Sequence, residues 1–360
     1  MGKATDTTAK GLLHPEKHPE EDGRDTALRP RSIAEFQGQK AMKENLAVFI
    51  EAARKRNESL DHLFLIGPPG LGKTTLAQVV AHELGADFKV TSAPALEKPK
   101  DLAGILTTLS EKSVFFIDEI HRLKPAIEEM LYIAMEDYEL DWIIGQGPSA
   151  RTIRIPIQPF TLVGATTKAG NVSSPLISRF GITFRFSFYE IEDMEAIVRR
   201  SAGILGIAIN DNAASLLARS ARGTPRVVNR LLRRVRDFAQ INATKVASAK
   251  AASMKAEPLI TKEIVEESLK RLEIDTLGLE RYDREILKII ITRYGGGPVG
   301  AETLAISIGE SVDTLEDYYE PYLIQAGLIQ RTPRGRVVTA LAYNYLKVPK
   351  ETEDEGLLFQ

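Results

Sequence analysis

The strongest fold signal in the chain lies at residues 63–75, which have the sequence LFLIGPPGLGKTT. The apolar run Leu63–Ile66 is typical of a buried strand, and Gly67–Thr74 matches the pattern G-x-x-x-x-G-K-[ST], which joins such a strand to a helix. Glycines such as Gly70 and Gly72 allow backbone N–H groups to wrap an anion, and the N-terminus of the following helix favours negative charge. The pattern therefore predicts a phosphate-binding loop. The alternative is a glycine-rich turn that only ends a strand.

Lys73, Thr74 and two acidic residues form a candidate nucleotide site. In this pattern the lysine reaches the β- and γ-phosphates, and the threonine hydroxyl binds Mg²⁺. Asp118 and Glu119 follow the apolar run Val114–Ile117, 45 residues after Lys73. We expect Asp118 to lie near Mg²⁺ and Glu119 to polarise a water molecule toward the γ-phosphate, so ATP or ADP and Mg²⁺ are the predicted cofactors. The alternative is a pair of solvated acids; a glycosidase pair is excluded because neighbouring residues on a strand point to opposite faces.

Short apolar runs alternate with helical patterns between residues 60 and 190. The helix Ala47–Arg56 is predicted to precede the first strand. The run at 114–117 has no polar alternation, which favours a strand buried on both faces. This alternation predicts an α/β P-loop domain, a parallel sheet with flanking helices. The predicted strands lie at 63–66, 88–90, 114–117, 160–165 and 182–186.

The chain is predicted to form three domains between two tails. The strands are lost after residue 190, and helical patterns dominate up to residue 272. An Ala/Lys/Ser-rich segment at 243–257 is either an exposed extension of a helix or a loose linker. Helices followed by a β-hairpin around Thr332-Pro333-Arg334-Gly335 predict a winged helix. The expected parts are a mobile tail at 1–27, a large ATPase domain at 28–190, an all-α lid at 191–272, a winged-helix domain at 273–343 and a tail at 344–360, acidic from Lys350.

Composition excludes several other classes of protein. The 360 residues contain no cysteine, which rules out disulfides, iron–sulfur clusters and a cysteine nucleophile, and the five histidines show no metal-ligand spacing. No apolar run is long enough to cross a membrane and no signal peptide is found, so a cytoplasmic protein is expected. The net charge is −2. Any contact with nucleic acid must therefore come from a local basic patch.

Three further polar residues are candidates for the nucleotide site. Thr167 closes the strand at 160–165; its hydroxyl is suited to the γ-phosphate or the attacking water, although such a threonine is usually an N-cap. Arg179 is either a surface ion-pair residue or a group that neutralises charge at a neighbouring subunit's nucleotide. Arg226 opens a helix in Gly223-Thr224-Pro225-Arg226 and is suited to phosphate contact from the second domain. His121 is predicted to be a polar residue at a helix start rather than a ligand.

Taken together, these motifs resemble the AAA+ ATPases, and within them the RuvB family. RuvB is the motor of the bacterial branch-migration machine that acts on Holliday junctions. The resemblance covers residues 28–343. It rests on Leu28-Arg29-Pro30, GPPGLGKTT at 67–75, VFFIDEIHRL at 114–123, MEDYELDWIIGQGPSAR at 135–151, FTLVGATTKAG at 160–170, SPLISRFGI at 174–182, GTPRVVNRLLRRVRDFA at 223–239 and YLIQAGLIQRTPRGR at 322–336.

The resemblance implies a role for each matching residue. In the family's terms, Lys73 and Thr74 are Walker A residues, Asp118 and Glu119 Walker B residues, Thr167 sensor 1, Arg179 the arginine finger and Arg226 sensor 2. Thr75 would make a further phosphate contact, and Leu28, Arg29 and Tyr189 would line the adenine pocket. Glu136, Asp137 and Tyr138 match further nucleotide contacts. Arg331 and Arg336 match the arginines of the wing that contact DNA, although a solvated turn is the plain alternative.

The implied function is ATP-dependent branch migration of Holliday junctions in recombination, DNA repair and the SOS response to DNA damage. The implied partners are duplex DNA, further copies of the chain in a hexameric ring, and a RuvA-type junction-binding protein that docks on a hairpin within 139–158; a junction resolvase is a further candidate. In that hairpin Trp142, Ile143 and Ile144 suit an apolar contact, but they could instead be local core.

The main alternative is another AAA+ machine, such as a clamp-loader subunit, an initiator or a protein-remodelling ATPase. A clamp loader more often carries asparagine at the strand end and lacks the wing sequence QRTPRGR. A protein unfoldase needs an aromatic pore loop, which is not found. The sequence departs from the family pattern at Lys168, where relatives usually carry arginine, and in the length of the 1–27 tail and the 243–257 segment.

Overall fold

A computed structural model of the chain describes residues 26–144, 151–249 and 258–349. The tail predicted at 1–27 therefore lies almost wholly outside the described residues. Of the tail predicted at 344–360, residues 344–346 instead belong to a helix, and residues from 350 on lie outside the described residues. The described residues form two compact units. The first contains residues 26–206 and Gly223–Asn229, and the second contains Ile207–Arg222 and the chain from Arg230 on. The two units divide the helical region predicted at 191–272 between them.

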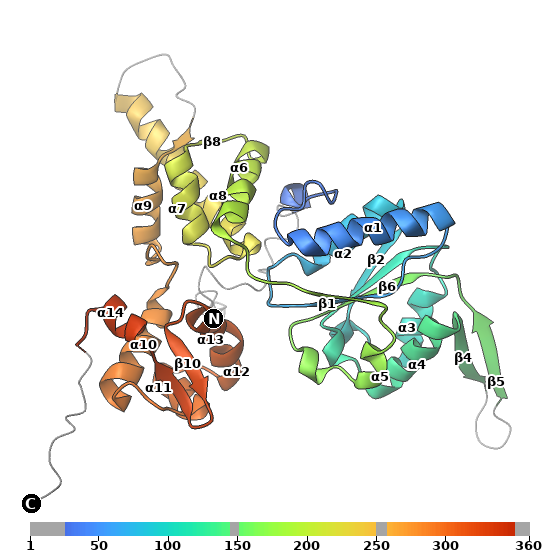
Figure 1. The fold of residues 1–360 in the computed structure, drawn as a ribbon. Coiled ribbons are helices and arrows are strands. Elements are labelled where there is room, and N and C mark those ends of the chain that lie inside the picture. Colours follow the sequence, from blue (N-terminus) through green and yellow to red (C-terminus); the bar gives the residue numbers. More distant parts are fainter. Residues whose placement is uncertain (1–25, 145–150, 250–257, 350–360) are drawn as a thin grey trace, which may run out of the picture. The chain divides into compact units, whose positions relative to one another are not determined.

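A five-stranded parallel sheet forms the centre of the first unit (Figure 1). The strand order is β2-β3-β6-β1-β7, and each predicted strand is present with an end shifted by no more than two residues. β1 and β6 are buried along their whole length, and β3 is buried up to its last residue, as expected for central parallel strands. The strands are β1 (Leu63–Ile66), β2 (Phe88–Ser92), β3 (Val114–Asp118), β6 (Thr161–Thr166) and β7 (Ile182–Arg185).

Helices cover both faces of this sheet, with α1 and α2 on one side and α3, α4 and α5 on the other (Figure 1). On the second face lies a hydrophobic core in which Phe64 and Phe115 of the sheet pack with Leu106 of α3 and Leu131 of α4. The helix predicted at Ala47–Arg56 is the second half of a longer helix. The helices are α1 (Lys40–Arg56), α2 (Lys73–Leu84), α3 (Pro99–Leu106), α4 (Pro125–Glu136), α5 (Ser174–Ile177) and α6 (Ile191–Ile204); the 3₁₀ turns are Thr26–Leu28, Ala93–Ala95, Ile120–Arg122 and Ala169–Asn171.

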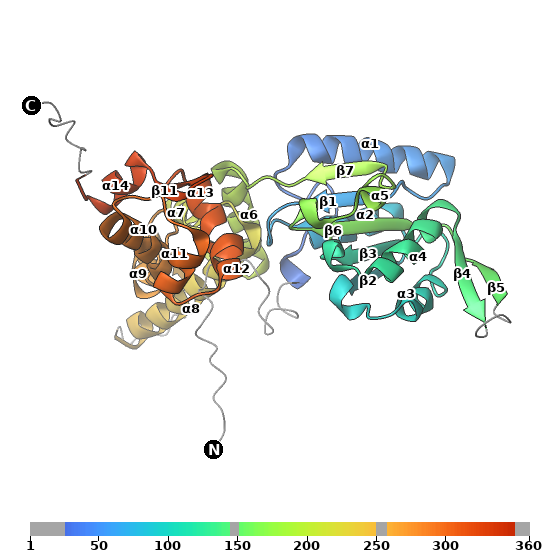
Figure 2. The same ribbon diagram turned by 90° about the horizontal axis from the view of Figure 1, so that it is seen from below.

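An antiparallel hairpin follows α4, as predicted for 139–158, and projects from the edge of the unit (Figure 2). It consists of β4 (Glu139–Ile144) and β5 (Arg151–Pro156), and its tip at 145–150 lies outside the described residues. Trp142 and Ile155 pack against the core of the unit, whereas Ile153 is 46% exposed. Trp142 thus belongs to the local core, as the alternative held, whereas docking of a partner on the hairpin stays a prediction.

The second unit begins with helices that carry a small parallel strand pair. β8 (Ala208–Ile209) pairs with β9 (Leu259–Ile260), whereas the sequence predicted no strand between residues 191 and 272. Two-residue strands are too short to show an alternating pattern, which explains the difference. The helices are α7 (Asp211–Arg219), which no pattern predicted, α8 (Pro225–Ala249), whose start up to Asn229 belongs to the first unit, and α9 (Lys262–Arg271). Of the segment 243–257, predicted as a helix extension or a loose linker, residues 243–249 extend α8. Residues 250–257 lie outside the described residues.

The end of the second unit is a winged helix, as predicted. Its core joins Ile286 and Ile290 of the first helix to Leu304, Leu323 and the wing strands. Between α12 and α13 the chain forms a π-helical turn, Leu315–Tyr319. The elements are α10 (Arg281–Tyr294), α11 (Ala301–Ile308), α12 (Val312–Thr314), α13 (Glu320–Gln325), β10 (Ile329–Thr332), β11 (Gly335–Val338) and α14 (Ala340–Leu346).

No helix within the described ranges is both long and apolar enough to span a lipid bilayer.

Candidate functional site

The phosphate-binding loop lies between β1 and α2, where the motif predicted it. Gly70 and Gly72 have φ values of +82° and +102°, a left-handed region that side chains rarely adopt. A Cβ atom on Gly72 would also lie 3.3 Å from Cζ of Phe36. Glycine at position 72 thus serves both the turn of the backbone and the close approach of the preceding segment. The first turn of α2 starts directly after it, at Lys73.

The Lys73 ammonium is buried beneath this loop. It donates to the carbonyl oxygens of Gly67 and Pro68, at 2.7 and 3.0 Å. Burial lowers the pKa of Lys73 to about 8, against the opposing effect of the Asp118 and Glu119 carboxylates. The site therefore holds a desolvated cation that donates to two uncharged carbonyl oxygens, an arrangement suited to an incoming anion.

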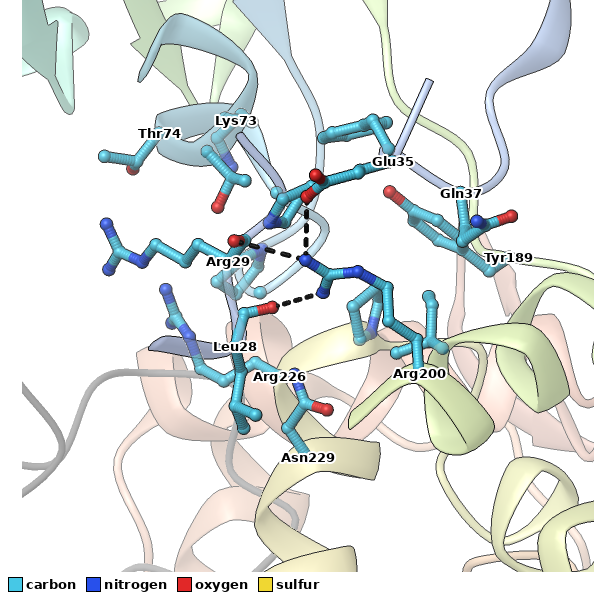
Figure 3. Close-up of a pocket in the computed structure, with 18 of the residues that line it drawn as sticks. Leu28, Arg29, Glu35, Gln37, Lys73, Thr74, Tyr189, Arg200, Arg226 and Asn229 are labelled. Carbon is cyan, nitrogen blue, oxygen red and sulfur yellow. Dashed lines mark hydrogen bonds and ion pairs between the residues drawn. The ribbon is translucent and has the colours of Figure 1, made fainter. Parts of the chain in front are cut away.

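A cavity of about 280 Å³ opens beside the loop, within the first unit (Figure 3). Most of the predicted nucleotide-site residues line it: Leu28, Arg29, Gly70, Gly72, Lys73, Thr74, Thr75, Asp118, Glu119, Tyr189 and Arg226. The sequence analysis missed further lining residues, among them Glu35, Phe36, Ile197, Arg200 and Asn229. The cavity therefore brings together residues from the chain segment before α1, the loop, the end of β3, α6 and the start of α8.

Arg200 organises the part of the cavity made by the N-terminal segment. Its guanidinium donates to the Leu28 carbonyl oxygen at 2.7 Å and pairs with Glu35 at 3.0 Å, as Figure 3 shows. Arg29 in turn donates to the Gln78 side chain at 3.1 Å. Arg200 lies 172 residues from Leu28 in the chain and belongs to no motif. In the sequence, Arg200 is one of many arginines on the polar side of an amphipathic helix, and this signal is too common to single it out.

Tyr189 and Gly223 position the segment that carries Arg226. The Tyr189 hydroxyl donates to the Leu71 carbonyl oxygen at 3.0 Å, and its backbone N–H donates to the Gly223 carbonyl oxygen at 2.9 Å. Burial raises the pKa of Tyr189 far above its usual value, so the hydroxyl stays a neutral donor. The backbone N–H of Arg226 lies 3.3 Å from the Gly70 carbonyl oxygen. The start of α8 is thereby anchored to the phosphate-binding loop.

Glu119 is held by two polar neighbours at the end of β3. The Thr167 hydroxyl donates to Oε2 of Glu119 at 3.2 Å, and Nδ1 of His121 lies 3.2 Å from the same oxygen. His121 also lies 2.9 Å from the Thr166 hydroxyl. Glu119 itself has a φ of +50°, unusual for a residue other than glycine. His121 is in a short helix, as predicted, but its contact with Glu119 was not foreseen, because the motif gives no tertiary partner.

The other predicted nucleotide contacts do not line this cavity. Thr167 reaches it only through Glu119, and Glu136, Asp137, Tyr138 and Arg179 lie outside its lining. Arg179 pairs with Glu136 at 3.1 Å, donates to the Pro175 carbonyl oxygen at 2.7 Å and lies 4.6 Å from the centre of the Tyr132 ring. Within a single chain, Arg179 is therefore an ion-pair residue near the surface, which was one of its two predicted roles.

The wing sequence predicts three arginines on a projecting turn, too exposed for ion pairs to add much stability. The structure contradicts this for two of them, which pair with carboxylates of the winged helix. Arg336 is only 12% exposed and pairs with both Glu316 and Glu320. Arg331, 48% exposed, pairs with the same fully buried Glu320. A carboxylate buried beneath the hairpin needs these partners, since a buried charge is costly unless it is paired. Arg334 at the turn is exposed.

These features define the class of protein. A parallel sheet, a glycine-rich loop with a buried lysine, an Asp-Glu pair at the end of the neighbouring strand and an arginine at the start of a lid helix are the parts of an AAA+ P-loop ATPase. Three family models match in order along the chain. They describe the "Holliday junction DNA helicase RuvB P-loop domain" at 28–186, the "RuvB AAA lid domain" at 189–259 and the "RuvB C-terminal winged helix domain" at 276–347. The chain belongs to the RuvB family.

Individual relatives agree with this assignment over almost the whole chain. The Holliday junction branch migration complex subunit RuvB of Treponema denticola is 71% identical over 95% of this chain and 97% of its own, and that of Treponema pallidum is 65% identical over 95% and 94%. The solved structure of the Thermotoga maritima RuvB Holliday junction branch migration motor is 48% identical, with a TM-score of 0.77 over 90% of this chain and 99% of its own. The fold class predicted from the sequence is thus confirmed.

Proposed function

We propose that the protein is an ATP-driven DNA translocase that moves the branch point of Holliday junctions during recombination and repair. The observation that carries the proposal is the convergence of Lys73, Thr74, Asp118, Glu119 and Arg226 on one cavity, in a chain that also has a winged helix. A nucleotide site and a DNA-binding module in one polypeptide are what such a motor needs. The names of the relatives specify the kind of DNA substrate.

The chemistry at the cavity is hydrolysis of the γ-phosphate of ATP. Lys73 binds the β- and γ-phosphates, and Arg226 contacts phosphate from the start of α8. Mg²⁺ would be held by the Thr74 hydroxyl and the Asp118 carboxylate and would neutralise phosphate charge. Both are oxygen donors that line the cavity, and Mg²⁺ bound to nucleotide commonly has few protein ligands. No cluster of three His, Cys, Asp or Glu residues occurs in the ranges described.

Glu119 is the proposed general base. Its Oε2 atom accepts a hydrogen bond from the Thr167 hydroxyl and lies 3.2 Å from Nδ1 of His121. Glu119 polarises the water that attacks the γ-phosphate. Thr167 is thereby a sensor that acts through Glu119 as well as through the phosphate. At the other end of the cavity, Leu28, Arg29 and Tyr189 are proposed to hold the adenine ring, and Thr75 a further phosphate oxygen.

We propose that Arg179 completes the nucleotide site of a neighbouring subunit in a hexameric ring. This role is supported by its position outside the lining of its own cavity. Glu136, Asp137 and Tyr138 are proposed to serve the same neighbouring site, since Glu136 is the ion-pair partner of Arg179. An arginine supplied to a second subunit makes hydrolysis depend on assembly.

The proposed partners follow from the remaining parts of the molecule. Duplex DNA contacts the wing through Arg331 and Arg336, with Arg334 beside them at the exposed turn. A RuvA-type protein docks on the hairpin of β4 and β5, which offers Ile153 to solvent. The hexameric ring, a junction resolvase as a further partner and a cytoplasmic location remain predictions from the sequence resemblance.

The test is ATP-dependent dissociation of a synthetic four-way junction, with and without a RuvA-type protein. The matched control is Glu119→Gln, which keeps the shape of the side chain and the Thr74 and Asp118 oxygens. We expect this variant to bind ATP normally and to lose hydrolysis by about a hundredfold or more, together with junction dissociation. Normal hydrolysis in Glu119→Gln would contradict the role of the base. A wild-type protein that hydrolyses ATP but leaves the junction intact with its partner present would contradict the proposed function.

A further inference from the structure

A buried ion pair joins the helical part of the second unit to its winged helix. Arg222 follows α7 and is 5% exposed; Asp283 lies in the first turn of α10 and is fully buried. The Arg222 guanidinium contacts Oδ2 of Asp283, and Nε of Arg222 donates to the Gly278 carbonyl oxygen at 2.7 Å. Burial alone would lower the pKa of Arg222, but the nearby Asp283 carboxylate outweighs this effect and raises the pKa above its ordinary value. The arginine therefore stays charged. The two residues are 61 positions apart in the chain.

Aromatic and acidic side chains of the winged helix enclose this pair. The Arg222 guanidinium lies 4.7 Å from the centre of the Tyr322 ring, a cation–π contact. Oδ2 of Asp283 also accepts the backbone N–H of Glu280 at 2.8 Å, and the Glu280 carboxylate accepts the Tyr318 hydroxyl at 2.6 Å. Arg222 therefore contacts the start of α10, the segment before it and α13 at once.

The backbones of the two parts also touch at this point. Gly278 has a φ of +76°, and a Cβ atom there would lie 2.5 Å from the Ser220 carbonyl oxygen. Arg222 has a φ of +57°, an unfavourable backbone conformation for an arginine. Among the described residues, Oδ1 of Asp283 has no hydrogen-bond partner. A joint with a strained residue and an unsatisfied buried oxygen is not arranged for stability alone, since apolar side chains would fill the same space at lower cost.

Arg222 lies close in the chain to a residue of the nucleotide cavity. Arg222 directly precedes Gly223, and three residues further on Arg226 lines the nucleotide cavity. One short turn thus carries both the contact to the nucleotide site and the contact to the winged helix. A displacement of this turn, caused by a change in the nucleotide, is transmitted to the DNA-binding part only if the joint at Arg222 is stiff.

We propose that Arg222, held by Asp283, is a positioning residue that makes the lid and the winged helix move as one body. The inference rests on the proposed function for its consequence, since stiffness at this joint converts ATP hydrolysis into movement of the DNA-binding wing. It concerns how motion is transmitted, and neither Arg222 nor Asp283 lines the nucleotide cavity.

The experiment compares Arg222→Met with Arg219→Met in the full-length protein. Arg219 is an exposed arginine at the end of α7, three residues before Arg222, so it is a matched control for the lost charge. Because the chain has no cysteine, two cysteines introduced at the exposed positions Asp211 and Ile306 can be spin-labelled selectively. The distribution of the distance between the labels measures the stiffness of the joint, whether or not the protein moves DNA. The second readout is junction dissociation per ATP hydrolysed.

We expect a narrow distribution in the wild type and in Arg219→Met, and a clearly broader one in Arg222→Met. ATP hydrolysis without DNA should stay within about twofold, while junction dissociation per ATP falls about tenfold, a size common for coupling between distant sites. Arg222→Lys should recover part of both, since lysine keeps the charge but lacks the planar fork that contacts Asp283 and Gly278 together.

Should Arg222→Met fail to fold, Asp283→Asn decides the matter, because its amide oxygen can still accept the Glu280 N–H while the charge is lost. An unchanged distance distribution in a folded variant would overturn the proposal. Equal loss of ATP hydrolysis and junction dissociation would also overturn it, because that pattern indicates general damage. A broader distribution in a protein whose wild type does not move junctions would leave the joint established and contradict only the proposed function.

Discussion

Lys73 shows how single side chains create the chemistry of the cavity. The positive φ values of Gly70 and Gly72 place the loop over its ammonium, which is desolvated and shares its surroundings with Asp118 and Glu119. A charge in such surroundings interacts more strongly with a phosphate than it would in water. The same burial makes the charge itself sensitive to pH.

ATP binding is predicted to weaken as the pH rises through about 8, the lowered pKa of Lys73. Below this pH the ammonium is already present; above it, ATP must bind together with a proton, because phosphate favours the charged form. Affinity should fall by up to about tenfold per pH unit there. Calorimetry in buffers of different ionisation enthalpy should show almost no proton uptake at about pH 6.5 and close to one proton at about pH 9. No uptake at either pH would contradict the argument.

The wing hairpin shows how an element can combine a structural and a binding role. Gly335, at the start of β11, has a φ of +136°, and a Cβ atom there would clash with the Val299 carbonyl oxygen. Backbone hydrogen bonds of 2.8 and 3.0 Å between Arg336 and Val299 hold the hairpin against the segment before α11. Beneath it, Glu320 is fully buried between Arg331 and Arg336. The wing is thus fixed at its base, and its turn is left to solvent.

Alanine substitutions in the wing are predicted to separate these roles. Arg336→Ala leaves Glu320 short of a partner, and the free energy of unfolding should fall by about 3 kcal/mol. Arg334→Ala should change it by less than about 0.5 kcal/mol. Arg331→Ala should lie between them, because Arg331 is half exposed and solvent screens its ion pair. Urea denaturation of the three variants measures these differences, and equal stability of all three would refute the structural role of Arg336.

Among the same variants, the loss of DNA affinity is predicted to be found where the replaced arginine side chain is exposed to solvent. Arg334→Ala and Arg331→Ala should each lower the slope of log affinity against log salt by about 0.9, the value for one phosphate contact. ATP hydrolysis without DNA should not change, because none of these residues lines the nucleotide cavity. A salt titration of duplex affinity is the measurement, with a folded protein confirmed in each case. An unchanged slope in both variants would mean that the wing does not hold phosphates.

For the molecule as a whole, the central question is whether one chain has a complete catalytic site. The cavity of the first unit contains Lys73, Glu119 and Arg226, whereas Arg179 does not line it and pairs with Glu136. A single chain therefore supplies the base and the phosphate ligands but keeps its candidate arginine finger elsewhere. Assembly would bring that arginine to another subunit's nucleotide.

Mixing experiments are predicted to reveal such sharing. Arg179→Ala keeps an intact cavity and Lys73→Ala keeps an intact Arg179, so each alone should be inactive. Mixed rings should regain part of the ATP hydrolysis, because some interfaces combine a sound cavity with a sound arginine, which can contribute about a thousandfold. Activity is measured against mixing ratio, with native mass spectrometry to show that mixed rings form. A flat background in proven mixed rings would assign Arg179 to its own chain.

The elements that the sequence predicted are those with local causes. Leu63–Ile66 and Val114–Ile117 are continuous apolar runs, and the loop after the first run has glycines where the backbone needs positive φ. Each of these signals is contained in a few consecutive residues, so the parallel sheet, the phosphate site and the winged helix could all be expected from them. The short pair of β8 and β9, and α7, lacked such a signal and were missed.

The contacts that complete the site depend on partners far apart in the chain. Arg200 meets Leu28 across 172 positions, Arg222 meets Asp283 across 61, and Arg336 meets Glu320 across 16. Periodicity and motif spacing describe neighbours along the chain, whereas a buried charge is satisfied by whichever group the packing brings beside it. The residue types of the nucleotide site were therefore evident in the sequence, but the pairing of its arginines and of those in the wing was decided by the tertiary structure.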